Sequence, residues 1–294
     1  MNNRRCVFCF LLLCSLLAVT ALAQAPQLTI TCFDVKAPVP GVLETDSYAI
    51  NDKGVIAGDY IDSSAVQHGM VLAGKTLTSF DGPPGSSLIA AYGINSVGVV
   101  AGWYNDSNGS SHGFLFANGV MTKVKFPLAI STQANGTNNN GYVVGSFVDA
   151  SGAGHGFYFD GKRYHRVDIP GGTSTNVWAI NDSNLMTVYT INSNGAFDGY
   201  TYDGTTFTLA DVPGAVSSVI HGINNNGDIN YTIFDSNGNR HGVLFHAGTF
   251  TQFDDPKGIN TTRADGLNDH LRQVGRYSPA SGNPPSAGFK CNAK

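Results

Sequence analysis

The chain repeats one short pattern six times, and this repeat limits its possible folds more than any other feature. An apolar residue, or threonine in one copy, precedes an asparagine in each copy. The asparagines are Asn51, Asn95, Asn138, Asn181, Asn224 and Asn268. Their spacings are 44, 43, 43, 43 and 44 residues. Such a period is typical of proteins built from stacked supersecondary units, in which each unit buries its apolar face against the next.

Each copy carries signals for four short strands joined by tight turns. An alanine or glycine precedes the apolar residue of the first strand, and glycine follows three positions after the asparagine in four copies. In copies two, three and five an Asp-x-x-Gly turn separates the second strand from the third. In copies two, three and four Asn-Gly or Asp-Gly, a strong hairpin signal, then leads into the fourth strand. That strand ends at aspartate, one residue and proline, which suits a strand end because proline has no N–H to donate.

These signals predict an all-β fold, a six-bladed β-propeller of four-stranded antiparallel blades. A linear β-solenoid is the alternative, although its repeats are usually much shorter than about 40 residues. The copies are out of phase with the chain ends. A strand-like segment, residues 29–35, precedes the first copy, and the sixth copy lacks a fourth strand. We therefore expect the N-terminal strand to complete the last blade and close the ring.

Two cysteines, Cys32 and Cys291, lie in the two strands of this expected seam. In an oxidising compartment they are candidates for a disulfide, and two free thiols are the alternative. Matching Phe33-Asp34 with Phe253-Asp254 places the cysteines about four residues out of register. That separation exceeds the Cα distance of about 7 Å that a disulfide tolerates. We expect a Cys32–Cys291 disulfide, although this alignment of the two strands argues against it.

The first 23 residues have the layout of a secretory signal peptide. Arg4 and Arg5 precede an apolar run, and Ala21-Leu22-Ala23 supplies a small-x-small cleavage site. An uncleaved membrane anchor is the alternative, but the run is short for a span of about 20 residues. We expect a secreted protein, extracellular or periplasmic, with a single domain over residues 24–294. No membrane association is expected after cleavage.

Composition narrows the function classes. Without Arg4 and Arg5 the chain has 15 Lys and Arg against 21 Asp and Glu, a net charge of −6. This balance argues against a nucleic-acid partner, which normally needs a basic stripe. No Gly-x-Ser-x-Gly elbow, phosphate loop, zinc spacing or nicotinamide fingerprint is present, so no cofactor and no catalytic residue is assigned. Glu44 is the only glutamate, which weakens a paired-carboxylate glycosidase.

Four histidines recur at the start of the third strand, each followed by glycine. They are His68, His112, His155 and His241. Metal ligands must converge on one ion at about 2 Å, whereas equivalent positions in different blades are spread around a ring. We therefore expect no metal site. Holding a loop, through the aspartate at the end of a fourth strand, is the expected role of these histidines.

These motifs resemble the HAF family of probable extracellular repeats. The resemblance rests on His-Gly-Phe at His112 and His155, together with the Ile-Asn, Asp-x-x-Gly and Asp-x-Pro-Gly elements. It extends over all six copies, although Asp198 and Ala287 replace the histidine in copies four and six. The resemblance implies an exported repeat protein without an assigned reaction, and it carries no catalytic residues to this chain.

Candidate binding residues are those that vary at a fixed repeat position, since a ligand site on a repeat protein need not repeat. Three residues before each asparagine the sequence has Tyr48, Tyr92, Asn135, Trp178, His221 and Asp265. Two residues earlier, copy six has Arg263. If the first strand lines the axis, these side chains lie at one mouth of the channel. The alternative is that the aromatic residues only pack between blades.

The sequence thus favours a secreted binding module for a glycan, a peptide or an envelope protein, acting as a monomer. The alternative is an extracellular lyase or hydrolase at the same mouth, with His221 and Asp265 as acid and base. A propeller fold hosts both classes and does not choose between them.

Overall fold

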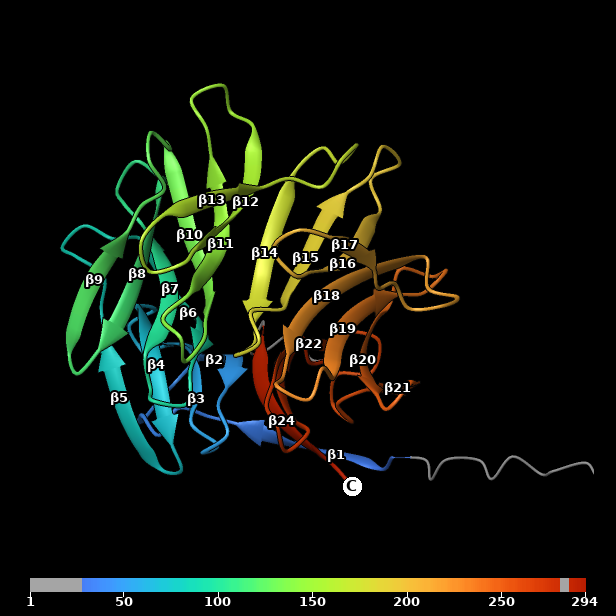
Figure 1. Cartoon of the computed structure of the whole chain (residues 1–294). Helices are drawn as coiled ribbons and strands as arrows, with labels where there is room; N and C mark the ends of the chain where they lie inside the picture. The colour runs from blue at the N-terminus through green and yellow to red at the C-terminus, as the bar shows by residue number, and fades with distance from the viewer. Residues whose placement is uncertain (1–27, 281–285) are drawn as a thin grey trace, which may run out of the picture.

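The computed structural model describes residues 28–280 and 286–294 (Figure 1). The expected signal peptide, residues 1–23, lies outside the described residues. Within them every regular element is a β-strand, and six four-stranded antiparallel units follow one another around an axis. The prediction of an all-β, six-bladed propeller is therefore confirmed. None of the described residues forms a helix long and apolar enough to cross a membrane.

The first strand of each blade lies next to the axis, and the fourth lies at the outer edge. Blades 1 and 2 comprise β2 (Glu44–Ile50), β3 (Ile56–Ile61), β4 (Gln67–Ala73), β5 (Thr76–Phe80), β6 (Leu88–Ile94), β7 (Val100–Asn105), β8 (Ser111–Ala117) and β9 (Val120–Val124). Blades 3 and 4 comprise β10 (Ser131–Thr137), β11 (Val143–Val148), β12 (Gly154–Phe159), β13 (Tyr164–Val167), β14 (Thr175–Ile180), β15 (Met186–Ile191), β16 (Phe197–Tyr202) and β17 (Phe207–Leu209). Blade 5 comprises β18 (Ser217–Ile223), β19 (Ile229–Phe234), β20 (Arg240–His246) and β21 (Thr249–Phe253).

Blade 6 is assembled from both ends of the chain. Its first three strands are β22 (Arg263–Leu267), β23 (Arg272–Tyr277) and β24 (Ala287–Ala293). Its outer strand is β1 (Ile30–Val35), which pairs antiparallel with β24. The N-terminal strand therefore completes the last blade, as the sequence predicts. The ring closes because strands from the two ends of the chain pair with each other.

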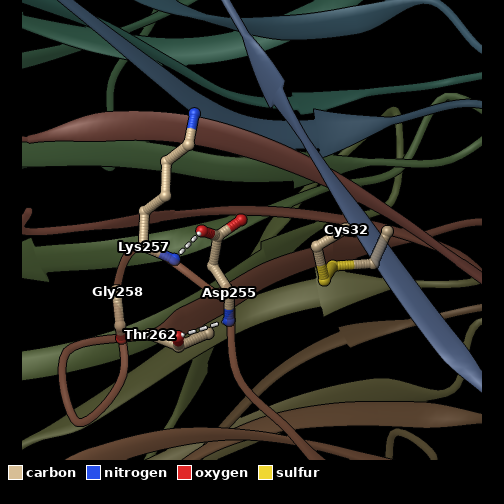
Figure 2. The surroundings of a disulfide bond; sticks show 6 residues. Cys32, Asp255, Lys257, Gly258 and Thr262 are labelled. Carbon is tan, nitrogen blue, oxygen red and sulfur yellow. Dashed lines mark hydrogen bonds between the residues drawn. A yellow bond between two sulfur atoms is a disulfide. The ribbon is translucent and has the colours of Figure 1, made fainter.

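The seam is locked by the Cys32–Cys291 disulfide. The two cysteines lie directly opposite each other in β1 and β24, with Cα atoms 4.0 Å apart. Figure 2 shows the disulfide near the loop that carries Asp255 and Lys257.

The predicted register of this seam is wrong: the match of Phe33 with Phe253 is displaced by two residues on β1, and the cysteines are not about four residues out of register but directly opposite each other. Val35, not Phe33, faces the glycine of the third strand, as Phe253 faces Gly242 in blade 5. The hydrogen bonds of the loop that follows β1 agree with this register. The amide of Ala37 donates to Thr45 Oγ1, as the amide of Asp255 donates to Thr262 Oγ1 in the loop after β21. The motif Lys36-Ala37-Pro38 is thus the Asp-x-Pro element with lysine in place of aspartate, which hid it.

The repeated asparagines form a closed ring of hydrogen bonds around the axis. Each side-chain Nδ2 donates to the carbonyl oxygen of the asparagine in the next blade, at 2.9–3.1 Å, and Asn268 donates back to Asn51. Each Oδ1 accepts from the amide four residues later, at 2.9–3.0 Å. One residue type therefore links adjacent blades and shapes its own turn, which explains why asparagine repeats.

The small residue before each apolar position is required by the close approach of the inner strands. A Cβ at Gly93 would lie 2.8 Å from the Asn135 carbonyl oxygen, and one at Gly266 would lie 2.7 Å from that of Tyr48. These are backbone atoms of the next blade, which cannot move aside easily. Glycine in four copies, and alanine at Ala49 and Ala179, therefore allow the six inner strands to meet at the axis.

Each described apolar cluster lies between neighbouring blades, so the core is a ring of interfaces. Phe80 of blade 1, for example, packs with Ile89 and Phe114 of blade 2. Blade 6 contains an exception. Gln273 is fully buried, and neither its Oε1 nor its Nε2 has a hydrogen-bond partner among the described residues. At the same position of β3, β7, β11, β15 and β19 the chain has Ile56, Val100, Val143, Met186 and Ile229.

Replacing this amide with an apolar side chain of similar volume is expected to stabilise the protein. Gln273→Met removes two unsatisfied polar atoms, so the free energy of unfolding should rise by about 1–3 kcal/mol. Urea unfolding measures the change. The reciprocal variant Met186→Gln should lower the same quantity, and a loss of stability in Gln273→Met would show that the amide is satisfied in solution.

Candidate functional site

A β-bulge in the first strand of each blade aims the predicted binding residues at the axis. The strand registers shift around Tyr48, Tyr92, Asn135, Trp178, His221 and Asp265, leaving each residue unpaired in its ladder. A bulge bends the strand and redirects the side chain of its extra residue. We call these six residues the axial plug. The structure therefore brings together six residues that the sequence spreads over 217 positions of the chain.

The aromatic members of the axial plug contact one another. The ring centroids of Tyr48 and Tyr92 are 4.3 Å apart, and those of Tyr92 and Trp178 are 5.2 Å apart in an edge-on arrangement. The rings of Trp178 and His221 lie 4.7 Å apart, again edge-on. Tyr48, Trp178 and His221 are buried, whereas Tyr92 is half-buried. The aromatic residues therefore pack against one another across blades, and Tyr92 is the one among them that stays partly accessible.

Two arginines of blade 6 lie over this aromatic layer. The guanidinium carbon of Arg263 is 5.4 Å from the Trp178 ring centroid, and that of Arg276 is 5.1 Å from the Tyr48 ring centroid. Arg263 Nε donates to Asp265 at 2.7 Å. Arg276 Nη1 donates to Asp46 at 2.7 Å and to the Tyr48 hydroxyl at 2.8 Å. Each guanidinium is thus fixed by a carboxylate and an aromatic face.

The accessible surface of the mouth comes from a further set of residues, which we call the rim. All of them are half-buried: Trp103, Gln133, Ser146, Asn176, Tyr189, Arg263 and Arg276. Arg263 was among the predicted site residues, but Trp103, Ser146, Tyr189 and Arg276 were not. They lie on the second strand of their blades, directly opposite Ala90, Gln133, Asn176 and Arg263. Cross-strand pairing with the variable position is the signal that could have found them.

The amide and hydroxyl groups of the rim form one network. Asn135 Nδ2 donates to Asn176 Oδ1 at 2.8 Å and to the Val177 carbonyl oxygen at 3.0 Å. Gln133 Nε2 donates to Ser111 Oγ at 3.3 Å. This network holds the polar half of the mouth, while Trp103 stacks on Tyr92 at a centroid distance of 5.9 Å. The mouth therefore combines preformed hydrogen-bonding groups with aromatic faces.

His221 and Asp265 do not form a reactive pair at the surface. His221 Nδ1 lies 3.8 Å from Asp265 Oδ1, beyond hydrogen-bond length, and both residues are only 1% exposed. Burial, together with the charges of Arg263 and Arg276, lowers the pKa of His221 well below its ordinary value. Burial also raises the pKa of Asp265, although the two arginines oppose this shift. A neutral imidazole beneath Trp178 has no access to a substrate bond in this conformation.

The channel below the axial plug is narrow. A space of about 80 Å³ lies between the plug and the layer formed by Ile50, Ile94, Thr137, Ile180, Ile223 and Leu267. This volume admits a few water molecules, not a sugar or a peptide. A ligand of that size at this mouth would therefore lie on the rim and not inside the ring.

The repeated histidines clamp loops, as the sequence suggested. His155 bridges two aspartates of its blade, with Nδ1 at 2.8 Å from Asp168 and Nε2 at 3.2 Å from Asp149. His68 bridges Asp81 and Asp62 in the same way, and these contacts raise the pKa of the imidazole against the effect of burial. In the described part of the chain, no group of three or more His, Cys, Asp or Glu side chains could hold a metal ion.

The comparisons with known proteins address the fold. No family model and no curated protein matches the chain. Among solved structures, a lectin variant of Aleuria aurantia in complex with Fucalpha1-6GlcNAc is 10% identical, with a TM-score of 0.52 over 83% of this chain and 91% of that chain. The SapL1 lectin in complex with alpha methyl fucoside is 11% identical, with a TM-score of 0.52 over 80% and 89%. TolB from Acinetobacter baumannii is 10% identical, with a TM-score of 0.53 over 86% and 65%. At such low identity these similarities show that the chain shares the β-propeller fold.

Proposed function

We propose that the protein is an exported carbohydrate-binding module whose ligand rests on the rim. One observation carries the proposal: on a scaffold that otherwise repeats, six bulges gather non-repeating aromatic, amide and charged residues at a single mouth. Residues that only hold the blades together can be the same in every copy, as the ring of asparagine hydrogen bonds shows. A departure from repetition at the mouth, where side chains from all six blades converge, is what a ligand site requires.

The chemistry of the rim suits a sugar. A sugar ring has an apolar face that packs on an aromatic side chain, and Trp103, Tyr92 and Tyr189 offer such faces at the mouth. Sugar hydroxyls both donate and accept hydrogen bonds. The guanidinium groups of Arg263 and Arg276 can donate to them, and the amides of the rim can do both. Two of the structures with the same fold are lectins by name, which supports the proposal.

The location proposed for this activity is extracellular or periplasmic. The Cys32–Cys291 disulfide supports an oxidising compartment, because disulfides persist there and are rare in the cytosol. The expected cleavage after Ala23 supports export. A monomer is proposed, since one chain supplies every residue of the rim.

A thermal-shift screen of residues 24–294 against glycans and peptides tests the proposal. A ligand at 100 times its Kd adds about 2.7 kcal/mol to stability, or roughly 5–11 °C in Tm for a domain of this size. We expect a glycan to produce such a shift and Tyr189→Ala to abolish it. Phe250→Ala, which truncates an exposed aromatic on the outer strand β21, is the matched control and should keep the shift. Stabilisation by peptides alone, or a glycan shift that survives Tyr189→Ala, would contradict the proposal.

A further inference from the structure

The loop at residues 125–130, between β9 and β10, departs from its two closest equivalents in the repeat. Residues 168–173 and 211–216 occupy the same place, 43 and 86 positions later. The changes are Lys125 for Asp168 and Asp211, Leu128 for Gly171 and Gly214, and Ile130 for Thr173 and Val216. All three substitutions make the loop more apolar or more basic. The repeat thus provides an internal control, against which this loop has acquired a distinct surface.

Leu128 is exposed at a cost to the backbone. It has φ of +62°, in the left-handed region, where Gly171 and Gly214 have +81° and +83°. Leucine is disfavoured there because its Cβ approaches the backbone carbonyl. Its side chain is nevertheless 94% exposed, and that of Ile130 is 58% exposed. A strained residue that contributes nothing to the core is a reason to look for a function outside the fold.

The loop is held rigidly, so this exposure is built into the fold. Phe126 stacks on Phe147 of blade 3 with ring centroids 3.7 Å apart, and its amide donates to Thr132 Oγ1 at 3.2 Å. Ala129, between the two exposed apolar residues, is buried. The anchored residues alternate with the protruding ones, and Figure 1 shows β9 and β10 as strands of adjacent blades on either side of the loop.

Two lysines precede the exposed apolar residues, and Asp149 follows Val148, whose carbonyl oxygen accepts from the Ile130 amide at 3.0 Å. No aspartate or glutamate lies between Asp106 and Asp149, the longest such interval in the sequence. Lys123 and Lys125 are exposed, and neither ammonium group bonds to a residue that the structure describes. Because Lys125 replaces the clamping aspartate, His112 bonds to Asp106 alone, at 2.8 Å. The exposed apolar side chains therefore have free positive charge on their N-terminal side.

In place of the expectation that the cleaved protein has no membrane association, we propose that this loop attaches the exported protein reversibly to an anionic lipid surface. Leu128 and Ile130 would enter the boundary between headgroups and acyl chains, and the two lysines would approach lipid phosphates. A small protruding tip offers too little area for a stable protein interface, which buries about 800 Å² on each partner. A bilayer needs no shape complementarity. The loop leads directly into β10, which carries the rim residue Gln133, and the inference does not rest on the proposed glycan site.

Co-sedimentation with vesicles tests this attachment. Residues 24–294 are mixed with vesicles of phosphatidylglycerol and phosphatidylcholine, and with pure phosphatidylcholine vesicles as the neutral reference. We expect Leu128→Gly to weaken partitioning onto the anionic vesicles about tenfold, since burial of a leucine side chain is lost. The same variant should raise Tm, because glycine suits the left-handed backbone. Lys125→Asp should weaken partitioning about fivefold or more.

A control variant and the stability of Leu128→Gly distinguish loss of membrane contact from misfolding. Val216→Ala, a truncation of another exposed apolar residue in an equivalent loop, should leave partitioning unchanged. Loss of binding in a Leu128→Gly protein that is more stable than the parent cannot be attributed to misfolding and supports the proposal. Equal partitioning onto anionic and neutral vesicles overturns it, as does undiminished binding by Leu128→Gly.

Discussion

Reduction of the Cys32–Cys291 disulfide is expected to lower the free energy of unfolding by about 5 kcal/mol. The bond joins residues 259 positions apart, and in the chain-entropy model so long a loop gives a stabilisation near the top of the usual range. Its loss leaves β1 attached to β24 only by strand pairing and by the apolar contacts of the seam. Urea unfolding with and without a thiol reductant measures the difference.

The double variant Cys32→Ser with Cys291→Ser separates the bond from the reductant. It should match the reduced protein in stability and show no response to added thiol. Hydrogen exchange of the β1 amides should also rise in this variant before that of β2, because the seam opens first. If reduction changes the free energy of unfolding by less than about 1 kcal/mol, strand pairing alone closes the ring and the account of the seam is wrong.

Asn181→Ala is expected to cost about 3 kcal/mol, a large effect for one small side chain. The amide of Asn181 donates to the Asn224 carbonyl oxygen at 3.1 Å, and its Oδ1 accepts from the amides of Ser183 and Leu185 at 3.1 and 3.0 Å. Alanine would leave these backbone groups without the partners that the ring provides, in a buried position. Chemical denaturation of the variant and the parent gives the cost.

Asn194→Ala is the matched control for this prediction. Asn194 is exposed in a turn of the same blade, and its side chain bonds to no described residue, so the change should stay within about 0.5 kcal/mol. Similar stability losses at Asn181 and Asn194 would mean that the axial ring of hydrogen bonds does not hold the blades together.

The architecture was predictable because the repeated residues mark the turns and strand ends of each blade. Asparagine, glycine and proline recur where a turn, a close approach or a strand end requires them, so their spacing fixed the number of blades. The incomplete sixth copy revealed how the ring closes. The register of β1 was missed because Lys36 replaces the aspartate of its motif, while the proline two residues later still marked the correct alignment.

The binding residues were predictable only in part. Variation at a fixed repeat position identified the axial plug, but it could not separate buried from accessible members. That separation depends on contacts between blades, such as Trp178 lying between His221 and Tyr92. The rim residues of the second strand were missed because their importance arises from cross-strand pairing. Tyr189 and Arg276 become neighbours of the variable positions only when the hairpins form.

Intrinsic tryptophan fluorescence tests the central claim most directly, because the chain contains only Trp103 and Trp178, and both lie at the mouth. A glycan that stabilises the protein should be titrated while the emission spectrum is recorded. A ligand on the rim is predicted to change the emission and to saturate at the concentrations that saturate the thermal shift, and Trp103→Phe should remove most of that change. A glycan that binds and stabilises the protein without altering the emission would place the site elsewhere and contradict the account.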